Sequence, residues 1–129
     1  MNAVDTNVLV RYLTVDDAVQ AGRARALIDG GPVWLSTTVL LETEWVLRSS
    51  YKLRPAAIMA ALRVLAGQET VTVEEPGRVA RAMSLCEAGM DFADALHLAA
   101  TPADAGFRSF DAALVKQAKR LGLKQVEEA

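Results

Sequence analysis

The chain has 129 residues, of which 52% are hydrophobic and 23% are charged, and its formal net charge is −2. This composition is typical of one soluble globular domain, and it argues against a protein that holds nucleic acid through bulk positive charge. No run of eighteen apolar residues occurs and no basic segment precedes an apolar one at the N-terminus, so we expect no membrane span, no signal peptide and a cytoplasmic location. The only cysteine, Cys86, lies among helix-forming residues and is expected to be a small core residue.

The residue pattern predicts short strands that alternate with helices. In chain order we expect a strand at 2–5, a helix at 7–13, a helix from Asp16 or Asp17 to about 28, a strand at 33–36 and helices at 37–50 and 55–66. A strand at 70–76, helices at 76–88 and 90–100, a strand at 106–110, a helix at 111–121 and a last strand at 123–126 follow. Strands joined through helices imply crossover connections and a parallel sheet covered on both faces. We therefore predict a single α/β domain over residues 1–129.

Several carboxylates stand where a strand ends or within an apolar helix. Asp5 follows the first predicted strand and Asp111 follows the fourth, whereas Glu42 lies among apolar helix residues. Asp91 and Asp94 are three residues apart at a helix start, which places them on one face. Because ligands in parallel α/β folds collect at the carboxyl ends of the strands, these acids are candidates for one site.

Each acid also has a purely structural interpretation. Asp5, Asp91 and Asp111 could be N-caps of the helices that follow them, and Glu42 could be solvated, as Glu44 is expected to be. Taken together, however, several carboxylates at one sheet edge would repel one another, and a hard divalent cation such as Mg²⁺ or Mn²⁺ relieves that repulsion. Such an ion can activate water for attack on a phosphoryl group. The sequence contains no serine-hydrolase elbow, P-loop or zinc-protease motif that would support another chemistry.

Four segments in order resemble the PIN-domain family: "VDTNVLVRYL", "STTVLLETEWVL", "DFADALHLA" and "FRSFD". More narrowly they resemble VapC-type toxins, the ribonuclease half of bacterial toxin–antitoxin pairs. The resemblance implies a PIN-like three-layer α/β/α sandwich with a short, mainly parallel central sheet. It also implies a Mg²⁺-dependent endoribonuclease, with Mn²⁺ as the other ion, an RNA substrate, a cognate VapB-like antitoxin and a homodimer.

The resemblance also implies roles for individual residues. It assigns metal binding and catalysis to four acids: Asp5, Glu42, Asp94 and Asp111. It assigns support of those acids or of the scissile phosphate to Thr6, Asn7, Asp91 and Ser109. Ser109 stands where relatives more often have threonine, and its hydroxyl is kept. Pro102 departs from the family pattern, since it should end the preceding helix near Ala100 or Thr101 and change the loop before the fourth strand.

Two other functions stay open. A haloacid-dehalogenase-like phosphatase also begins with an aspartate after its first strand, but it normally has a second aspartate two residues later, where this chain has Asn7. A non-catalytic PIN-like module that binds RNA or protein is the main alternative to the nuclease. Loss of a metal-site acid would indicate that module, and none of the four acids is lost.

Overall fold

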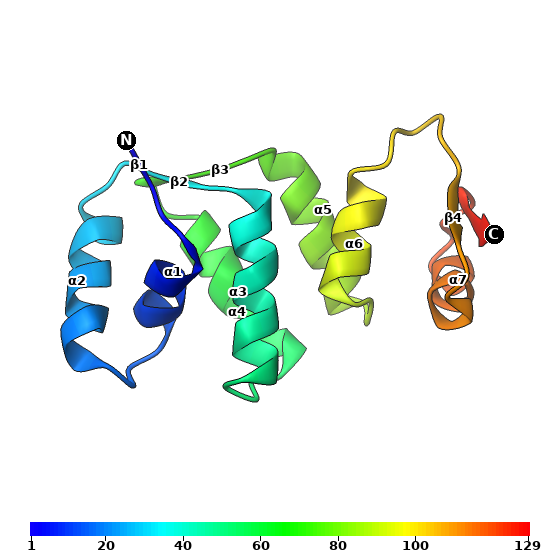
Figure 1. The fold of residues 1–129 in the computed structure, drawn as a ribbon. Helices are drawn as coiled ribbons and strands as arrows, with labels where there is room; N and C mark the ends of the chain where they lie inside the picture. Colours follow the sequence, from blue (N-terminus) through cyan, green and yellow to red (C-terminus); the bar gives the residue numbers. More distant parts are fainter.

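A computed structural model describes all residues from 1 to 129, and it contains seven α-helices and five short β-strands (Figure 1). The elements of the first half are β1 (Asn2–Ala3), α1 (Thr6–Leu13), α2 (Ala18–Asp29), β2 (Val33–Leu35), α3 (Thr37–Ser49) and α4 (Pro55–Ala66). Those of the second half are β3 (Val71–Val73), α5 (Pro76–Glu87), α6 (Phe92–Ala99), β4 (Phe107–Ser109), α7 (Ala112–Arg120) and β5 (Val126–Glu128). The predicted mixed α/β class is confirmed, and its short parallel sheets are consistent with the expected α/β/α sandwich.

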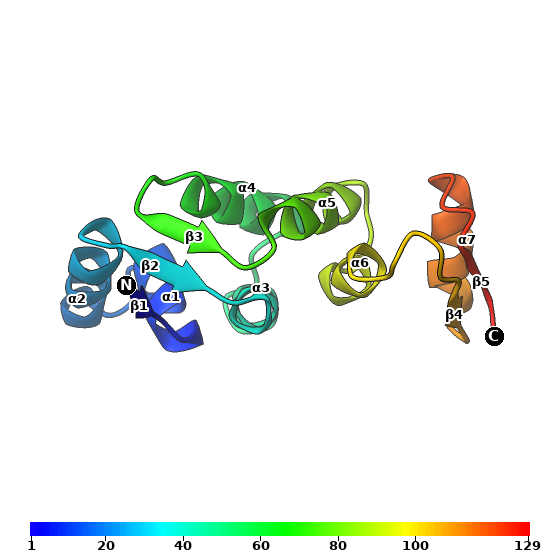
Figure 2. The ribbon, with the colours of Figure 1, turned by 90° about the horizontal axis from the view of Figure 1, so that it is seen from above.

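The parallel strands form two separate sheets rather than one central sheet. Strands β1, β2 and β3 lie in that order, with Ala3 opposite Trp34 and Val33 opposite Val71. Strands β4 and β5 form a second, two-stranded parallel sheet in which Phe107 lies opposite Val126. In both views β4 lies on the far side of α6 from β1 (Figures 1 and 2). The connection responsible for this separation is the segment 100–106, which joins the end of α6 to β4.

Pro102 acts as the sequence predicts. Helix α6 ends at Ala99 with Ala100 as its C-cap, because the residue before a proline disfavours the helical conformation. The last strand, in contrast, begins later than predicted. The backbone N–H of Leu123 bonds to the Ala118 carbonyl and that of Val126 bonds to the Leu123 carbonyl. Residues 123–125 therefore form the turn after α7, and β5 starts only at Val126.

One apolar core connects all parts of the chain. Helices α1 to α4 lie below the sheet of β1, β2 and β3 in the view of Figure 1. Fully buried side chains from these elements include Leu9, Ile28, Leu35 and Leu62, and α6 adds Phe92. The same cluster of buried residues extends into α7 through Leu114, Val115 and Ala118. None of the seven helices combines the length and the apolar character that a membrane span requires.

The C-terminal unit, defined as β4, α7 and β5, contacts the turn between α5 and α6. Gly89 in that turn has a φ of +110°, a conformation that side chains with a Cβ rarely adopt. A Cβ at this position would also lie 3.0 Å from Nε2 of Gln117 on α7. Nearby, Nη2 of Arg120 donates a hydrogen bond of 3.4 Å to the Ala88 carbonyl. The turn thus needs glycine for its backbone and for the close approach of α7.

Candidate functional site

The first group of site residues lies where β1 leads into α1. Asp5 is the N-cap of α1, and its Oδ1 accepts a hydrogen bond of 3.3 Å from the backbone N–H of Val8. The hydroxyl of Thr6, which is only 7% exposed, donates a hydrogen bond to Oε1 of Glu42 on α3. This bond places the Glu42 carboxylate beside the residue that follows Asp5. Two motifs far apart in the sequence therefore meet here.

The second group lies at the N-termini of α6 and α7. Asp91 is the N-cap of α6, and its Oδ2 accepts a hydrogen bond of 3.2 Å from the backbone N–H of Asp94. Asp111 is the N-cap of α7, and its backbone N–H donates a bond of 2.9 Å to Oγ of Ser109. Burial raises the pKa of Asp94, and the charges of Asp91 and Asp111 raise it further. Asp94 and Asp111 are thus within electrostatic reach of each other.

The capping interpretation of three acids is confirmed. Asp5, Asp91 and Asp111 each accept a hydrogen bond from a backbone N–H in the first turn of the helix that follows. A cap and a ligand are compatible roles, since a carboxylate has several lone pairs and a cap uses only one of them.

The acids match a divalent cation in chemistry but do not surround one in this arrangement. All four predicted ligands, Asp5, Glu42, Asp94 and Asp111, are hard oxygen donors of the kind that Mg²⁺ prefers. Yet no three carboxylate, imidazole or thiolate side chains lie close enough together to hold a metal ion. The topology accounts for the position of Asp111, because this residue follows a strand that is not paired with β1. The acids therefore form two separate groups. The first acidic group consists of Asp5 and Glu42, and the second consists of Asp91, Asp94 and Asp111.

An ion pair that sequence reasoning missed connects α3 to the second acidic group. Glu44, expected to be solvated, is only 2% exposed, and its Oε2 accepts a bond of 2.8 Å from Nε of Arg48. The Glu44 hydrogen bond raises the pKa of Arg48. The same guanidinium has its Nη2 3.8 Å from Oδ1 of Asp91. The spacing of four residues between Glu44 and Arg48 on one helix is the signal that could have revealed this pair.

Asn7, the remaining predicted support residue, is exposed and makes no hydrogen bond through its side chain. It lines a pocket of about 330 Å³ between α1 and α2, together with Arg11, Gln20 and Arg23. Sequence reasoning did not place Gln20 or Arg23 near the site. Their spacing of three residues on α2 puts them on one face of that helix.

Short parallel strands, crossover helices and acids at helix N-termini define an α/β protein with an acidic site. The family model of the PIN domain matches residues 3–128, so the chain belongs to the PIN-domain family. Membership indicates a nuclease-type hydrolase that acts on nucleic acid, and PIN nucleases generally use divalent metal ions. No curated protein and no solved structure matches the chain.

Proposed function

We propose that the protein is a metal-dependent endoribonuclease that hydrolyses RNA phosphodiesters as a single domain over residues 1–129. The observation that carries the proposal is the hydrogen bond from Thr6 to Glu42, which joins the first and second acidic motifs in a chain of the PIN-domain family. A hydrogen bond to a carboxylate is stronger than one between neutral groups, so it can hold Glu42 at the start of α1.

The residues proposed to hold the metal are Asp5, Glu42, Asp94 and Asp111. When bound there, Mg²⁺, or Mn²⁺ in its place, would stabilise negative charge on the phosphoryl group and make a bound water a better nucleophile. Thr6 positions Glu42, and Asp91 positions Asp94 through the backbone of α6. Because water rather than the RNA 2′-hydroxyl attacks, the products carry 5′-phosphate and 3′-hydroxyl ends.

Sharing of one ion requires the two acidic groups to come closer than they lie here. In this proposal α6 and the C-terminal unit approach α1 when metal and RNA bind. A cation between carboxylates removes the electrostatic cost of bringing them together, so a bound metal would favour this approach.

The separation of the two acidic groups favours a second candidate function. A PIN-like module without catalysis, which binds RNA or protein, needs no assembled cluster of acids. The two candidates differ in one observable, because only the nuclease breaks phosphodiester bonds.

The proposed biological role is that of the toxin in a VapBC-type toxin–antitoxin pair, acting in the cytoplasm as a homodimer. This role rests on the resemblance of the four motifs to VapC-type toxins. Co-expression with the product of a neighbouring small gene, followed by purification and measurement of the mass of the complex, tests both the antitoxin and the dimer.

Incubation of mixed cellular RNA with the purified protein tests the nuclease. We expect cleavage with Mg²⁺, none with EDTA, and a loss of at least about 100-fold in the Asp5→Asn and Asp94→Asn variants. Asp104→Asn, which changes an exposed acid in the loop after α6, is the matched control and should keep full activity. Cleavage that is unaffected by EDTA and by both substitutions would overturn the metal mechanism. A folded wild type that binds RNA without cleaving it would support the binding module instead.

A further inference from the structure

The pocket between α1 and α2 begins next to the first acidic group. Asn7 and Arg11 lie one turn apart on α1, and Gln20, Arg23 and Leu27 lie three and four residues apart on α2. These two helix faces therefore form opposite walls of the pocket. Asn7 lies in the first turn of α1 and Asp5 caps that turn, so the pocket starts within one helical turn of the first acidic group.

The pocket is lined by groups that donate hydrogen bonds. Two guanidinium groups and two carboxamides line it, and no carboxylate does. Arg23 makes no hydrogen bond or ion pair within the protein, so its charge is free for a ligand. Arg11 is paired with Asp16, so Arg23 is the arginine of the pocket whose charge has no acidic partner. A small anion with several acceptor oxygens is the ligand chemistry that matches this pocket.

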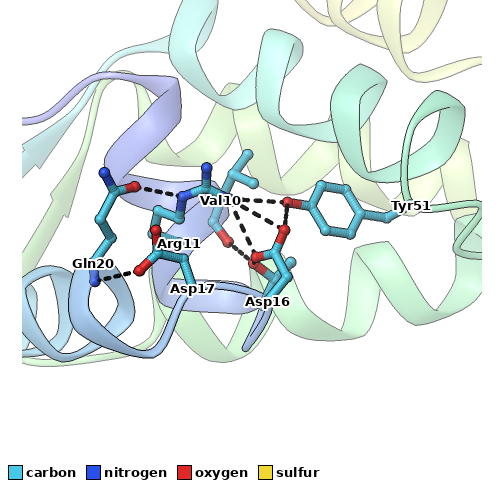
Figure 3. Close-up of polar contacts among 7 residues, drawn as sticks. Val10, Arg11, Asp16, Asp17, Gln20 and Tyr51 are labelled. Carbon is cyan, nitrogen blue, oxygen red and sulfur yellow. Dashed lines mark hydrogen bonds and ion pairs between the residues drawn. The ribbon is translucent and has the colours of Figure 1, made fainter.

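The Arg11 guanidinium is held in place before any ligand arrives (Figure 3). Its Nε donates a bond of 2.7 Å to Oε1 of Gln20, and its Nη1 lies 3.2 Å from Oδ1 of Asp16. Nη1 also donates to the hydroxyl of Tyr51 at 3.3 Å, and that hydroxyl donates to Oδ2 of Asp16 at 2.7 Å. These contacts leave Nη2 without a partner. A guanidinium fixed in this way loses little conformational entropy when it binds a ligand.

The contact with Arg11 also orients Gln20. Since Oε1 of Gln20 accepts the bond from Arg11, the amide nitrogen of Gln20 remains available as a donor. Val8 and Leu27 give the pocket an apolar part, and its volume of about 330 Å³ is at the lower end of the range for small-molecule sites. The size suits one phosphate with the sugar attached to it.

We propose that this pocket binds a backbone phosphate of the RNA next to the phosphodiester that is cut, with Arg23, Nη2 of Arg11 and the amides of Asn7 and Gln20 as donors. The inference rests on the proposed function, because it takes the RNA to be held at the neighbouring acidic group. It names Arg23 as a residue that binds substrate without taking part in the chemistry.

Equilibrium binding of a fluorescent single-stranded RNA, measured by anisotropy in EDTA so that the RNA stays intact, tests the proposal. Arg23→Gln should weaken binding about three- to tenfold, by the same factor for different RNA sequences, and should reduce the slope of log affinity against log salt by about 0.7. The matched control is Arg25→Gln, which removes the same charge from the same helix outside the pocket. It should change affinity less than about twofold and leave the slope unchanged.

Equal effects of Arg23→Gln and Arg25→Gln, or no effect of either, would overturn the phosphate site. A polyglutamate peptide that binds more tightly than the RNA, and loses this binding in Arg23→Gln, would also overturn it and would assign the pocket to an acidic protein segment. The result is separate from the nuclease test. If binding depends on Arg23 but the protein never cleaves RNA, the phosphate site is kept and the nuclease is rejected. If the protein cleaves RNA but Arg23→Gln binds RNA as tightly as the wild type, the nuclease is kept and the phosphate site is rejected.

Discussion

The hydroxyl of Thr6 donates a hydrogen bond to Oε1 of Glu42, and this contact joins the first turn of α1 to α3 across 36 positions of the chain. Thr6 is buried whereas Glu42 is exposed, so the buried partner fixes the position of the exposed carboxylate. The side chain of Thr6 thus explains why a hydroxyl follows the first acid of the chain. The Thr6 hydroxyl positions Glu42 on α3 and makes no hydrogen bond to Asp5.

The first prediction concerns this contact. Thr6→Val keeps the shape of the side chain but removes the donor, so Glu42 loses its fixed position. We expect RNA cleavage to fall about 10- to 100-fold because a misplaced catalytic group has a cost of that size. Thr6→Ser keeps the donor and is expected to retain most of the activity. Equal activity of the valine and serine variants, both folded, would contradict the positioning role.

The second prediction concerns the buried carboxylate of Glu44 and its partner Arg48. Arg48→Met should destabilise the protein by about 2–3 kcal/mol, because it leaves a buried charge without its hydrogen-bond partner. The double variant Glu44→Gln with Arg48→Met should be more stable than Arg48→Met alone, since no unpaired charge remains. Urea unfolding of the wild type, the single variants Glu44→Gln and Arg48→Met, and the double variant gives the coupling free energy. Additive effects would mean that the two side chains do not depend on each other.

The third prediction is that Cys86 is unreactive in the folded protein. The residue is 5% exposed, and burial, followed by the nearby negative charges of Glu44 and Asp91, raises the pKa of its thiol to about 11. At about pH 8 the thiolate fraction is then about a hundredfold lower than for an ordinary thiol. A thiol reagent should therefore label the native chain at least about a hundredfold more slowly than the unfolded chain. Rapid labelling of the native protein would contradict the buried position.

The fourth prediction concerns the pH dependence of stability through Asp16. Hydrogen bonds from Tyr51 and then from Thr14 lower the pKa of this carboxyl below its ordinary value of 3.8. A lowered pKa in the folded state means that the ionised form stabilises the fold above the unfolded pKa, and that this stabilisation is lost as pH falls through the folded pKa. The thermal midpoint of the wild type should therefore exceed that of Asp16→Asn above about pH 5. The difference should shrink as pH falls below 3.8.

Asp104→Asn is the control for this experiment, because the Asp104 side chain is exposed and makes no hydrogen bond. Its thermal midpoint should follow that of the wild type at every pH. A constant difference between Asp16→Asn and the wild type from neutral to acid pH would show that ionisation of Asp16 does not stabilise the fold.

Local sequence signals predicted the elements well. Aspartates at three helix starts are N-caps as proposed, Asp17 rather than Asp16 caps α2, and Pro55 begins α4. These features depend on residues within one turn of each other, so the sequence contains all the information that they need. The end of α6 before Pro102 is another feature that nearby residues determine.

Relationships between distant segments were predicted less well. The four acids were expected at one sheet edge, and whether they meet there depends on the strand order, which the residues near each acid in the chain do not reveal. Because β4 pairs with β5 and not with β1, Asp111 joins Asp94 rather than Asp5. The burial of Glu44 could not be predicted for the same reason, because it depends on which distant segments pack against α3 and not on the residues near Glu44 in the chain. The family resemblance implied that Thr6 supports the acids or the scissile phosphate, and the structure identifies its hydrogen-bond partner as Glu42.

Titration of the metal-free protein with Mn²⁺, in which the magnetic resonance signal of free aqueous Mn²⁺ reports binding, tests the central claim most directly. If Asp5 and Asp94 serve one ion, Asp5→Asn and Asp94→Asn should each weaken the same site by at least about tenfold, while Asp104→Asn leaves it unchanged. If either aspartate variant binds Mn²⁺ as tightly and in the same amount as the wild type, the two acidic groups do not share an ion and the proposed catalytic site is wrong.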